Sequence, residues 1–384
     1  SSDVCSSDLG IRPVWKPDFC PSKRKFASMY RNLYCLLMLA ALLPSCSKTS
    51  PRISVVCEEN NVGNSVVKWE TIPEIPGEVK VYASESPEHT GTEHLVASAP
   101  ISDQHLTIIT TDPMRRYYYR MVFAEKYKVD MATRNINIPG IQNFRDLGGY
   151  PSYPHHKFVR WGMLYRSGEI NRLRKGSLKK LKNLGIRTII DLRSPEEKME
   201  LSKSLEKNFS VVSIPIATGN MEQIINGVQD RSIRSDTVYR IVERMNRELI
   251  TKYAAQYRKV FDLLLNEDNY PVVIHCSSGK GRTGIVSALI LACLDVNEDK
   301  IMEDYRLSND YFNIPRATRY AYNLPIRSQE AITTLFSARE DFLNAAKEEA
   351  ERQYGDIKTY LREGIGLSKQ EMKHLRNILL TKQP

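Results

Sequence analysis

One short stretch of the chain carries the residue types of a covalent catalyst. It reads HCSSGKGRTG at residues 275–284, where Cys276 and Arg282 enclose five small or basic residues. The β-branched run VVI precedes it, and the apolar run TGIVSALILACLDV follows. This order predicts a buried strand, then a loop, then a helix. A loop that enters a helix N-terminus aims backbone N–H groups at one point, which makes a binding site for an anion.

The side chains of this loop suit a phosphate group. Its glycines allow a tight curl and its serines are too small to block it: Gly279, Gly281, Gly284, Ser277 and Ser278. Arg282 brings a planar fork that can bind two oxygens of a tetrahedral oxyanion. The amide dipoles and Arg282 should also hold the pKa of the Cys276 thiol below its usual value of about 8.5. A thiolate facing a bound phosphate is a nucleophile for in-line attack.

Three further residues of the loop have more than one interpretation. Thr283 can donate its hydroxyl to the sulfur and help it leave when water breaks a phosphocysteine. His275 either orients the loop from behind or is a buried structural histidine. Lys280 adds positive charge at the mouth of the loop, either for any phosphate or for a second phosphate of the substrate.

Other functions explain this stretch less well. A structural cysteine requires neither the glycines nor Arg282, and a Walker-type loop would have Ser or Thr directly after the lysine. The seven cysteines form no CxxC pair and no metal-ligand spacing with histidine, so no disulfide framework, metal or cofactor is predicted. The net charge is +10, but basic residues are spread among acidic ones along most of the chain, so we predict no nucleic-acid partner.

The hydrophobic pattern divides the chain into two folded parts. Residues 53–135 contain short segments of period two between turn-rich pieces, which predicts a small antiparallel sandwich of the immunoglobulin or fibronectin kind. Trp69 and Tyr118 are its predicted core residues. Residues 136–384 alternate strands, such as IRTIIDL and VVSIPI, with amphipathic helices. This predicts an α/β fold with a central, mostly parallel sheet flanked by helices.

The N-terminal residues indicate processing. Residues 1–28 precede a plausible start methionine and are expected to be non-native, and residues 29–45 read as a lipoprotein signal peptide. Their apolar core is shorter than the roughly 20 residues that span a bilayer. Cys46 is the predicted lipidation site, and residues 46–52 form a tether. The protein is therefore expected to be exported and anchored by lipid to a bacterial membrane, on its periplasmic or cell-surface side.

Several motifs across residues 135–384 resemble one known family. They are NFRDLGGY (143–150), LYRSGEINRL (164–173), IIDLRSPEE (189–197), DYRLSNDYF (304–312) and YGDIKTYLREGIGLS (354–368). With the cysteine loop, they resemble the bacterial secreted tyrosine phosphatases, including the mycobacterial protein tyrosine phosphatase B type, which also acts on phosphoinositides. The signal peptide and β-domain in front resemble an arrangement found in gut bacteria of the Bacteroides type.

The resemblance implies a cysteine-phosphatase fold and hydrolysis of phosphomonoesters through a phosphocysteine. The leading hypothesis is a protein tyrosine phosphatase, which needs no metal. The first alternative is a phosphatase of phosphoinositides or of inositol polyphosphates such as phytate. Lys280 favours this alternative. The second is a phosphate-binding or scaffolding lipoprotein with low turnover. The flanking motifs disfavour a sulfurtransferase, which uses a similar cysteine loop.

The general acid that should protonate the leaving oxygen is not assigned. The family usually has an aspartate where this chain has Gly281, and relatives commonly place another after the strand equivalent to VVSIPI. The nearest carboxylate there is Glu222. Further candidates are Asp146, Asp191 and Asp230. The first two lie within two positions of an arginine, so structural ion pairs are their alternative role.

Overall fold

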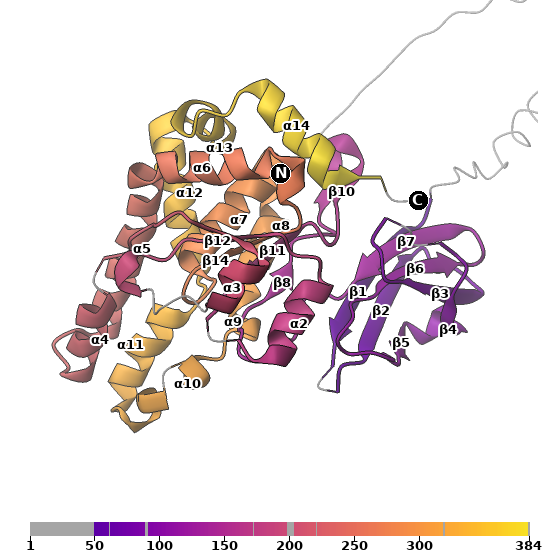
Figure 1. The fold of residues 1–384 in the computed structure, drawn as a ribbon, viewed down its shortest axis with the longest axis horizontal. Helices are drawn as coiled ribbons and strands as arrows, with labels where there is room; N and C mark the ends of the chain where they lie inside the picture. The colour runs from indigo at the N-terminus through magenta and orange to yellow at the C-terminus, as the bar shows by residue number, and fades with distance from the viewer. Residues whose placement is uncertain are drawn as a thin grey trace, which may run out of the picture. The chain divides into compact units, whose positions relative to one another are not determined.

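The structure is a computed structural model that describes residues 50–60, 62–88, 91–171, 173–197, 203–219, 221–317 and 319–382 (Figure 1). The predicted signal peptide, Cys46 and most of the tether lie outside these residues. Within them, no helix is long and apolar enough to cross a membrane. The same residues contain no group of three or more His, Cys, Asp and Glu side chains placed to hold a metal ion.

The N-terminal β-rich part contains two antiparallel sheets. The first has the order β1-β2-β5, with β1 (Arg52–Glu59), β2 (Ser65–Ile72) and β5 (His105–Ile108). The second has the order β4-β3-β6-β7, with β3 (Glu78–Ser84), β4 (Leu95–Pro100), β6 (Tyr118–Phe123) and β7 (Tyr127–Ala132). The predicted antiparallel strands are confirmed. The immunoglobulin or fibronectin topology stays a prediction.

The alternating pattern of these strands places one face of each in a shared core. Trp69 is 4% exposed, its ring lies edge-on to Phe123, and its Nε1–H donates to the Ile101 carbonyl at 2.8 Å. Apolar residues of β2, β3 and β6 surround it in one cluster. Tyr118 is buried as predicted, but it lies outside that cluster.

The second part is built around a five-stranded sheet. Its order is β13-β12-β14-β11-β8, with β8 (Arg145–Asp146), β11 (Leu164–Ser167), β12 (Thr188–Asp191), β13 (Ser210–Ser213) and β14 (Val272–His275). Only β8 is antiparallel to its neighbour. A second, small sheet of this part has the order β15-β10-β9, with β9 (Pro151–Ser152), β10 (Lys157–Val159) and β15 (Leu380–Thr381). The predicted mostly parallel sheet is confirmed.

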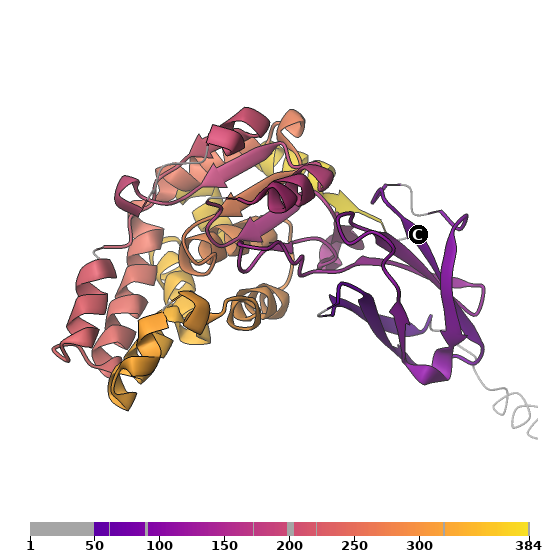
Figure 2. The ribbon, with the colours of Figure 1, turned by 60° about the horizontal axis from the view of Figure 1, so that its bottom comes forward.

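Helices cover both faces of the five-stranded sheet (Figures 1 and 2). Their bounds are α2 (Lys175–Asn183), α3 (Lys203–Asn208), α4 (Met221–Gln229), α5 (Ser235–Lys252), α6 (Ala254–Leu264), α7 (Gly281–Cys293), α8 (Glu298–Arg306), α9 (Ser308–Tyr311), α10 (Ile314–Ala317), α11 (Ile326–Phe336), α12 (Glu340–Tyr354), α13 (Ile357–Thr359) and α14 (Lys369–Leu379).

The period of two in the strands assigns side chains to these faces. In β14, Val272 and Ile274 join the cluster that includes α6, α7, α12 and α14. Val273 points the other way, into the cluster that includes residues of α2 and α3. Because β14 is fully buried on both faces, the loop that follows it starts from a fixed position.

Candidate active site

The loop between β14 and α7 carries the predicted nucleophile. It leaves the carboxyl end of a central strand, where ligands bind in open α/β sheets. Cys276 is 1% exposed. Burial by itself would raise the pKa of its thiol, but the positive charge of Arg282 and hydrogen bonds from Thr283 and the Gly279 N–H outweigh it. The pKa of Cys276 therefore lies below its usual value, as expected for a nucleophilic thiolate.

The guanidinium of Arg282 is paired with a carboxylate. Its guanidinium binds both carboxylate oxygens of Glu197, with an Nη2–Oε1 distance of 2.6 Å, and also donates to the Ile216 carbonyl at 3.0 Å. The Ser277 hydroxyl donates to the same carboxylate at 2.8 Å. Glu197 thus occupies the fork of Arg282 in the way that two oxygens of a phosphate would.

Glu197 is anionic in this arrangement. Burial would raise the pKa of its carboxyl group, but the hydrogen bonds and charge of Arg282 lower it to about 2. A carboxyl group with so low a pKa holds no proton to donate near neutral pH, so the pair does not supply the missing general acid. Sequence reasoning missed this residue, although it ends the motif IIDLRSPEE. The presence of a carboxylate at the end of a family motif was the signal that could have identified Glu197.

Buried donors outside the loop fix its backbone. The Asn143 amide donates to the carbonyls of Ser278 and Gly279 at 3.0 and 3.1 Å, and Arg166 donates to the Gly279 carbonyl at 2.7 Å. In a trans peptide, the N–H points away from the C=O. Holding the Ser278 carbonyl against Asn143 therefore turns the Gly279 N–H toward the sulfur.

A single buried carboxylate holds the arginines of this support. Asp304 forms ion pairs with Arg166 and with Arg145, the latter at 3.1 Å, and accepts from the Tyr150 hydroxyl at 3.2 Å. The two guanidinium groups hold the pKa of Asp304 well below its usual range, although burial opposes this. The motifs NFRDLGGY, LYRSGEINRL and DYRLSNDYF therefore share one task, which is to hold the cysteine loop from outside.

The glycines of the loop are not equally required. Gly279 has φ +70°, and a Cβ there would lie 2.4 Å from the Ser167 backbone. At Gly284 a Cβ would lie 2.9 Å from the Tyr305 ring. Gly281 has no positive φ, and a Cβ there would meet no atom within 4 Å, so the predicted need for glycine in the curl is wrong at this position. The structure has room there for the aspartate that the family usually carries.

Lys280 lies elsewhere than predicted. Its side chain is buried instead of projecting from the mouth of the loop, and its Nζ donates to the Leu335 carbonyl of α11 at 2.7 Å. The amine also lies 5.8 Å from the centre of the Phe336 ring. Burial lowers the pKa of Lys280 to about 7, against a smaller opposing effect of the Cys276 charge. The predicted position of Lys280 is wrong because the last turn of α11 covers this side of the loop and accepts a hydrogen bond from the amine.

His275 is buried, which agrees with both of its interpretations. Its ring is buried, with Nε2 3.7 Å from Asp191. Asp191 is itself bound by Arg193, at 2.9 Å for the ion pair. The predicted role of Asp191 in a structural ion pair with a nearby arginine is therefore confirmed.

The other candidate acids are also placed away from the sulfur. Asp146 is buried, binds Arg116 at 2.6 Å and accepts two backbone N–H groups. Asp230 accepts the Ser232 N–H at 2.8 Å at the exposed end of α4, and Glu222 is exposed in the first turn of that helix. Among the described residues, no hydrogen bond or ion pair joins Asp146, Asp230 or Glu222 to the cysteine loop. The general acid stays unassigned.

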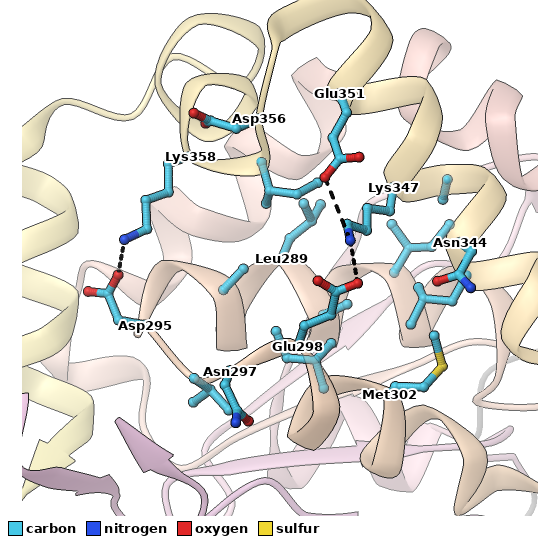
Figure 3. A pocket seen from close by; sticks show the side chains of 18 of the residues that line it. Leu289, Asp295, Asn297, Glu298, Met302, Asn344, Lys347, Glu351, Asp356 and Lys358 are labelled. Carbon is cyan, nitrogen blue, oxygen red and sulfur yellow. Dashed lines mark hydrogen bonds and ion pairs between the residues drawn. The ribbon is translucent and has the colours of Figure 1, made fainter. Parts of the chain in front are cut away.

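An apolar cavity of about 610 Å³ lies on the other side of α7 (Figure 3). Its walls come from α7, α8, α12 and α13, and its rim carries paired charges, including Lys358 with Asp295 at 2.6 Å. No residue of the loop 275–283 lines it. It is therefore separate from the reaction centre.

A thiolate after a central strand, an arginine six positions later and inward-turned amides define the class of cysteine-dependent phosphatases. Residues 136–381 match the model of the tyrosine phosphatase family, and the chain belongs to that family.

Known proteins similar to this chain carry related names. A tyrosine-protein phosphatase of Cupriavidus necator is 30% identical over 230 residues, which cover 59% of this chain and 82% of that protein. The triple specificity protein phosphatase PtpB of Mycobacterium tuberculosis is 27% identical over 284 residues, covering 65% of this chain and 100% of that protein. The solved core catalytic domain of the PP-IP phosphatase SIW14 from S. cerevisiae is 19% identical and has a TM-score of 0.25. That match covers 48% of this chain and 87% of the solved chain.

The position of Glu197 leads to a prediction about anion binding. A phosphate must displace this carboxylate from Arg282 and overcome its like charge. Replacing Glu197 by glutamine should therefore lower the inhibition constant of inorganic phosphate by about fivefold, or about 1 kcal/mol. The inhibition constant is measured by competition with an aryl phosphate substrate. Because the pKa of Glu197 is about 2, the effect should be present at every pH above about 4.5 and fade only below it.

The neighbouring Glu196 supplies a matched control. Its side chain is exposed, and no described contact joins it to Arg282. Glu196→Gln should leave the inhibition constant within twofold of wild type. An unchanged or higher constant in Glu197→Gln would show that Glu197 positions Arg282 for phosphate and does not compete with it.

Proposed function

We propose that this chain hydrolyses phosphotyrosine in proteins through a phosphocysteine at Cys276. The thiolate attacks phosphorus, the P–O bond to the tyrosyl oxygen breaks, and this oxygen leaves as a phenolate that takes up a proton from water. Water then attacks the phosphocysteine, and the sulfur leaves as thiolate with inorganic phosphate as the second product. The observation that carries this proposal is the lowered pKa of Cys276 beside Arg282 within a family-matching domain.

The lack of an assigned general acid supports phosphotyrosine over alkyl phosphates. A tyrosine phenol has a pKa of about 10, whereas an alcohol holds its proton at pH values several units higher. A phenolate therefore leaves with less help from a proton donor than an inositol or serine alkoxide does. The loop position where the family usually has an aspartate is Gly281, and among the described residues no hydrogen bond or ion pair joins Glu222 to the loop.

The second candidate is a phosphatase of phosphoinositides or inositol polyphosphates. Lys280 favours it, because its amine would add a cation next to the bound phosphate if the bond to Leu335 opened. The similar protein named triple specificity protein phosphatase also supports a broad substrate range. These observations are weaker than the leaving-group argument, since the Lys280 amine already has a partner.

One substrate panel tests both candidates. Purified protein is incubated in chelator with a phosphotyrosine peptide, a phosphoinositide and phytate, and released phosphate is measured. We expect the highest kcat/KM on the phosphotyrosine peptide. Higher kcat/KM on either inositol substrate would replace the first candidate with the second. No release from any of them would leave the low-turnover scaffold as the remaining function.

We also propose that the protein is exported and lipid-anchored through Cys46. Support comes from the order of basic residue, apolar run and cysteine in residues 29–46. Expression with radiolabelled palmitate in a bacterial host should label the wild-type protein and not Cys46→Ala. Equal labelling of both proteins would show that another residue is modified, and no labelling would exclude the anchor.

A further inference from the structure

A basic recess lies next to the catalytic loop, between α5 and α11. Figures 1 and 2 show these helices side by side, and the Ser235 and Thr334 hydroxyls join them at 3.1 Å. The recess has a volume of about 990 Å³. Its lining includes the arginines Arg234, Arg240, Arg327 and Arg339, against the acids Asp236 and Glu330. These charges give the recess a net charge of +2.

Two of the four guanidinium groups are available to a ligand. Arg240 is paired with Asp236 at 2.9 Å, and Arg339 stacks over the Tyr239 ring at 5.3 Å. Arg234 and Arg327 are exposed, and neither forms an ion pair with another residue in the described part of the chain. Arginine forks without a carboxylate partner are suited to binding carboxylates or phosphates.

The start of helix α5 favours the same ligands. The 18-residue helix α5 begins at Ser235, so the positive end of its dipole and its first N–H groups lie at the recess. Thr333 and Ser337 line the facing side. Their hydroxyls donate to the carbonyls of Gln329 and Thr333 at 2.9 and 2.6 Å, so the helix N-terminus is what adds to the effect of the arginines for an acidic ligand.

The recess is connected to the catalytic loop through α11. Lys280 of the loop donates to the carbonyl of Leu335, and Thr334, the preceding residue, lines the recess. The last turn of α11 thus contacts the catalytic loop and also forms one wall of the recess. A helical turn rises by about 5.4 Å, and an extended peptide advances by roughly 3.3 Å per residue. A peptide bound at Cys276 therefore needs only a few residues to reach the arginines.

We propose that this recess binds an acidic segment of the substrate protein that flanks the phosphotyrosine. This inference rests on the proposed function and adds a substrate preference to it. A polypeptide can present carboxylates and apolar side chains together, and the surface beside the recess offers partners for both. Tyr322 and Ile326, at 65% and 81% exposure near the start of α11, offer apolar contacts beside the acidic ones.

The test compares two phosphotyrosine peptides that differ only in their flanks, one carrying four glutamates and the other four glutamines. Their kcat/KM values are measured for wild type and for the double variant Arg234→Glu with Arg327→Glu. The ratio of acidic to neutral peptide should fall by about tenfold in the double variant. The double variant Arg362→Glu with Lys373→Glu provides a control of the same charge change at two exposed sites outside the recess, and should leave the ratio unchanged.

A binding measurement keeps this inference separate from the proposed function. Fluorescence anisotropy of a labelled acidic peptide without phosphotyrosine is followed with wild-type protein and with the double variant, and should show weaker binding by the variant. This arm remains informative even if no peptide is hydrolysed. An unchanged ratio together with unchanged binding would overturn the proposal. Loss of binding to anionic phospholipid vesicles, with the peptide ratio unchanged, would assign the recess to a membrane and also overturn it.

Discussion

Cys276→Ser is expected to lower kcat/KM for a phosphotyrosine peptide by at least about 10⁴-fold. The serine hydroxyl keeps its proton at neutral pH, whereas Arg282 and the loop hydrogen bonds stabilise the thiolate. No phosphoenzyme of the thiol kind can then form. Released phosphate gives the rate, and rapid acid quench with labelled substrate shows whether a covalent intermediate accumulates on the wild-type protein and is missing from the variant.

Cys293→Ser is the matched control for this substitution. Cys293 lies at the other end of α7 and is also buried, but burial raises the pKa of its thiol to about 12. The control should keep kcat/KM within about threefold of wild type. Alkylation by iodoacetamide should show the same contrast, because Cys276 should react at a lower pH than an ordinary cysteine. Turnover that survives in Cys276→Ser would rule out the covalent mechanism.

The catalytic loop could be predicted from the sequence because its parts are consecutive. Strand, Cys276, glycines, Arg282 and helix follow one another within residues 272–293, and local propensities place them without help from distant residues. The parallel sheet follows from similarly local evidence, since short β-branched runs alternate with amphipathic helices. Trp69 was likewise identified as a core residue from the period of its own strand.

Contacts between distant segments could not be predicted in this way. Glu197 is far from Arg282 in the chain, and its motif gave no sign of which arginine it binds. The Lys280 side chain was placed wrongly because its direction depends on Leu335, which belongs to a helix beyond the sheet. Local patterns report which face of an element is buried, but they do not report which partner it meets.

The family motifs include residues whose role becomes clear only in the structure. Asn143 and Arg166 come from different motifs, yet both donate to the Gly279 carbonyl. Their shared target shows why these motifs occur together with the cysteine loop in one chain. A phosphate site made of backbone amides needs its carbonyls held outside, because an amide that rotates away no longer contributes to the site.

The largest effect on stability is expected at Asp304, which binds the buried arginines that support the loop. Asp304→Asn should lower the free energy of unfolding by about 3–5 kcal/mol, because it leaves two fully buried guanidinium groups without a carboxylate. Asparagine has nearly the same shape, so the loss reports charge and hydrogen bonding more than packing. The quantity is measured by urea denaturation. Asp262→Asn, which weakens an exposed pair with Arg258 at 2.7 Å, should cost less than about 1 kcal/mol.

The pH dependence distinguishes this ion pair from simple packing. The pKa of Asp304 is lowered in the folded protein, so its contribution is complete above the ordinary carboxyl pKa of about 3.9 and is lost as the pH falls through the lower folded value. The difference between wild type and Asp304→Asn should therefore stay constant from pH 8 to pH 5 and shrink only in stronger acid. A difference below about 1 kcal/mol at pH 7 would mean that the two arginines find other partners, and the loop would then not depend on Asp304 for its shape.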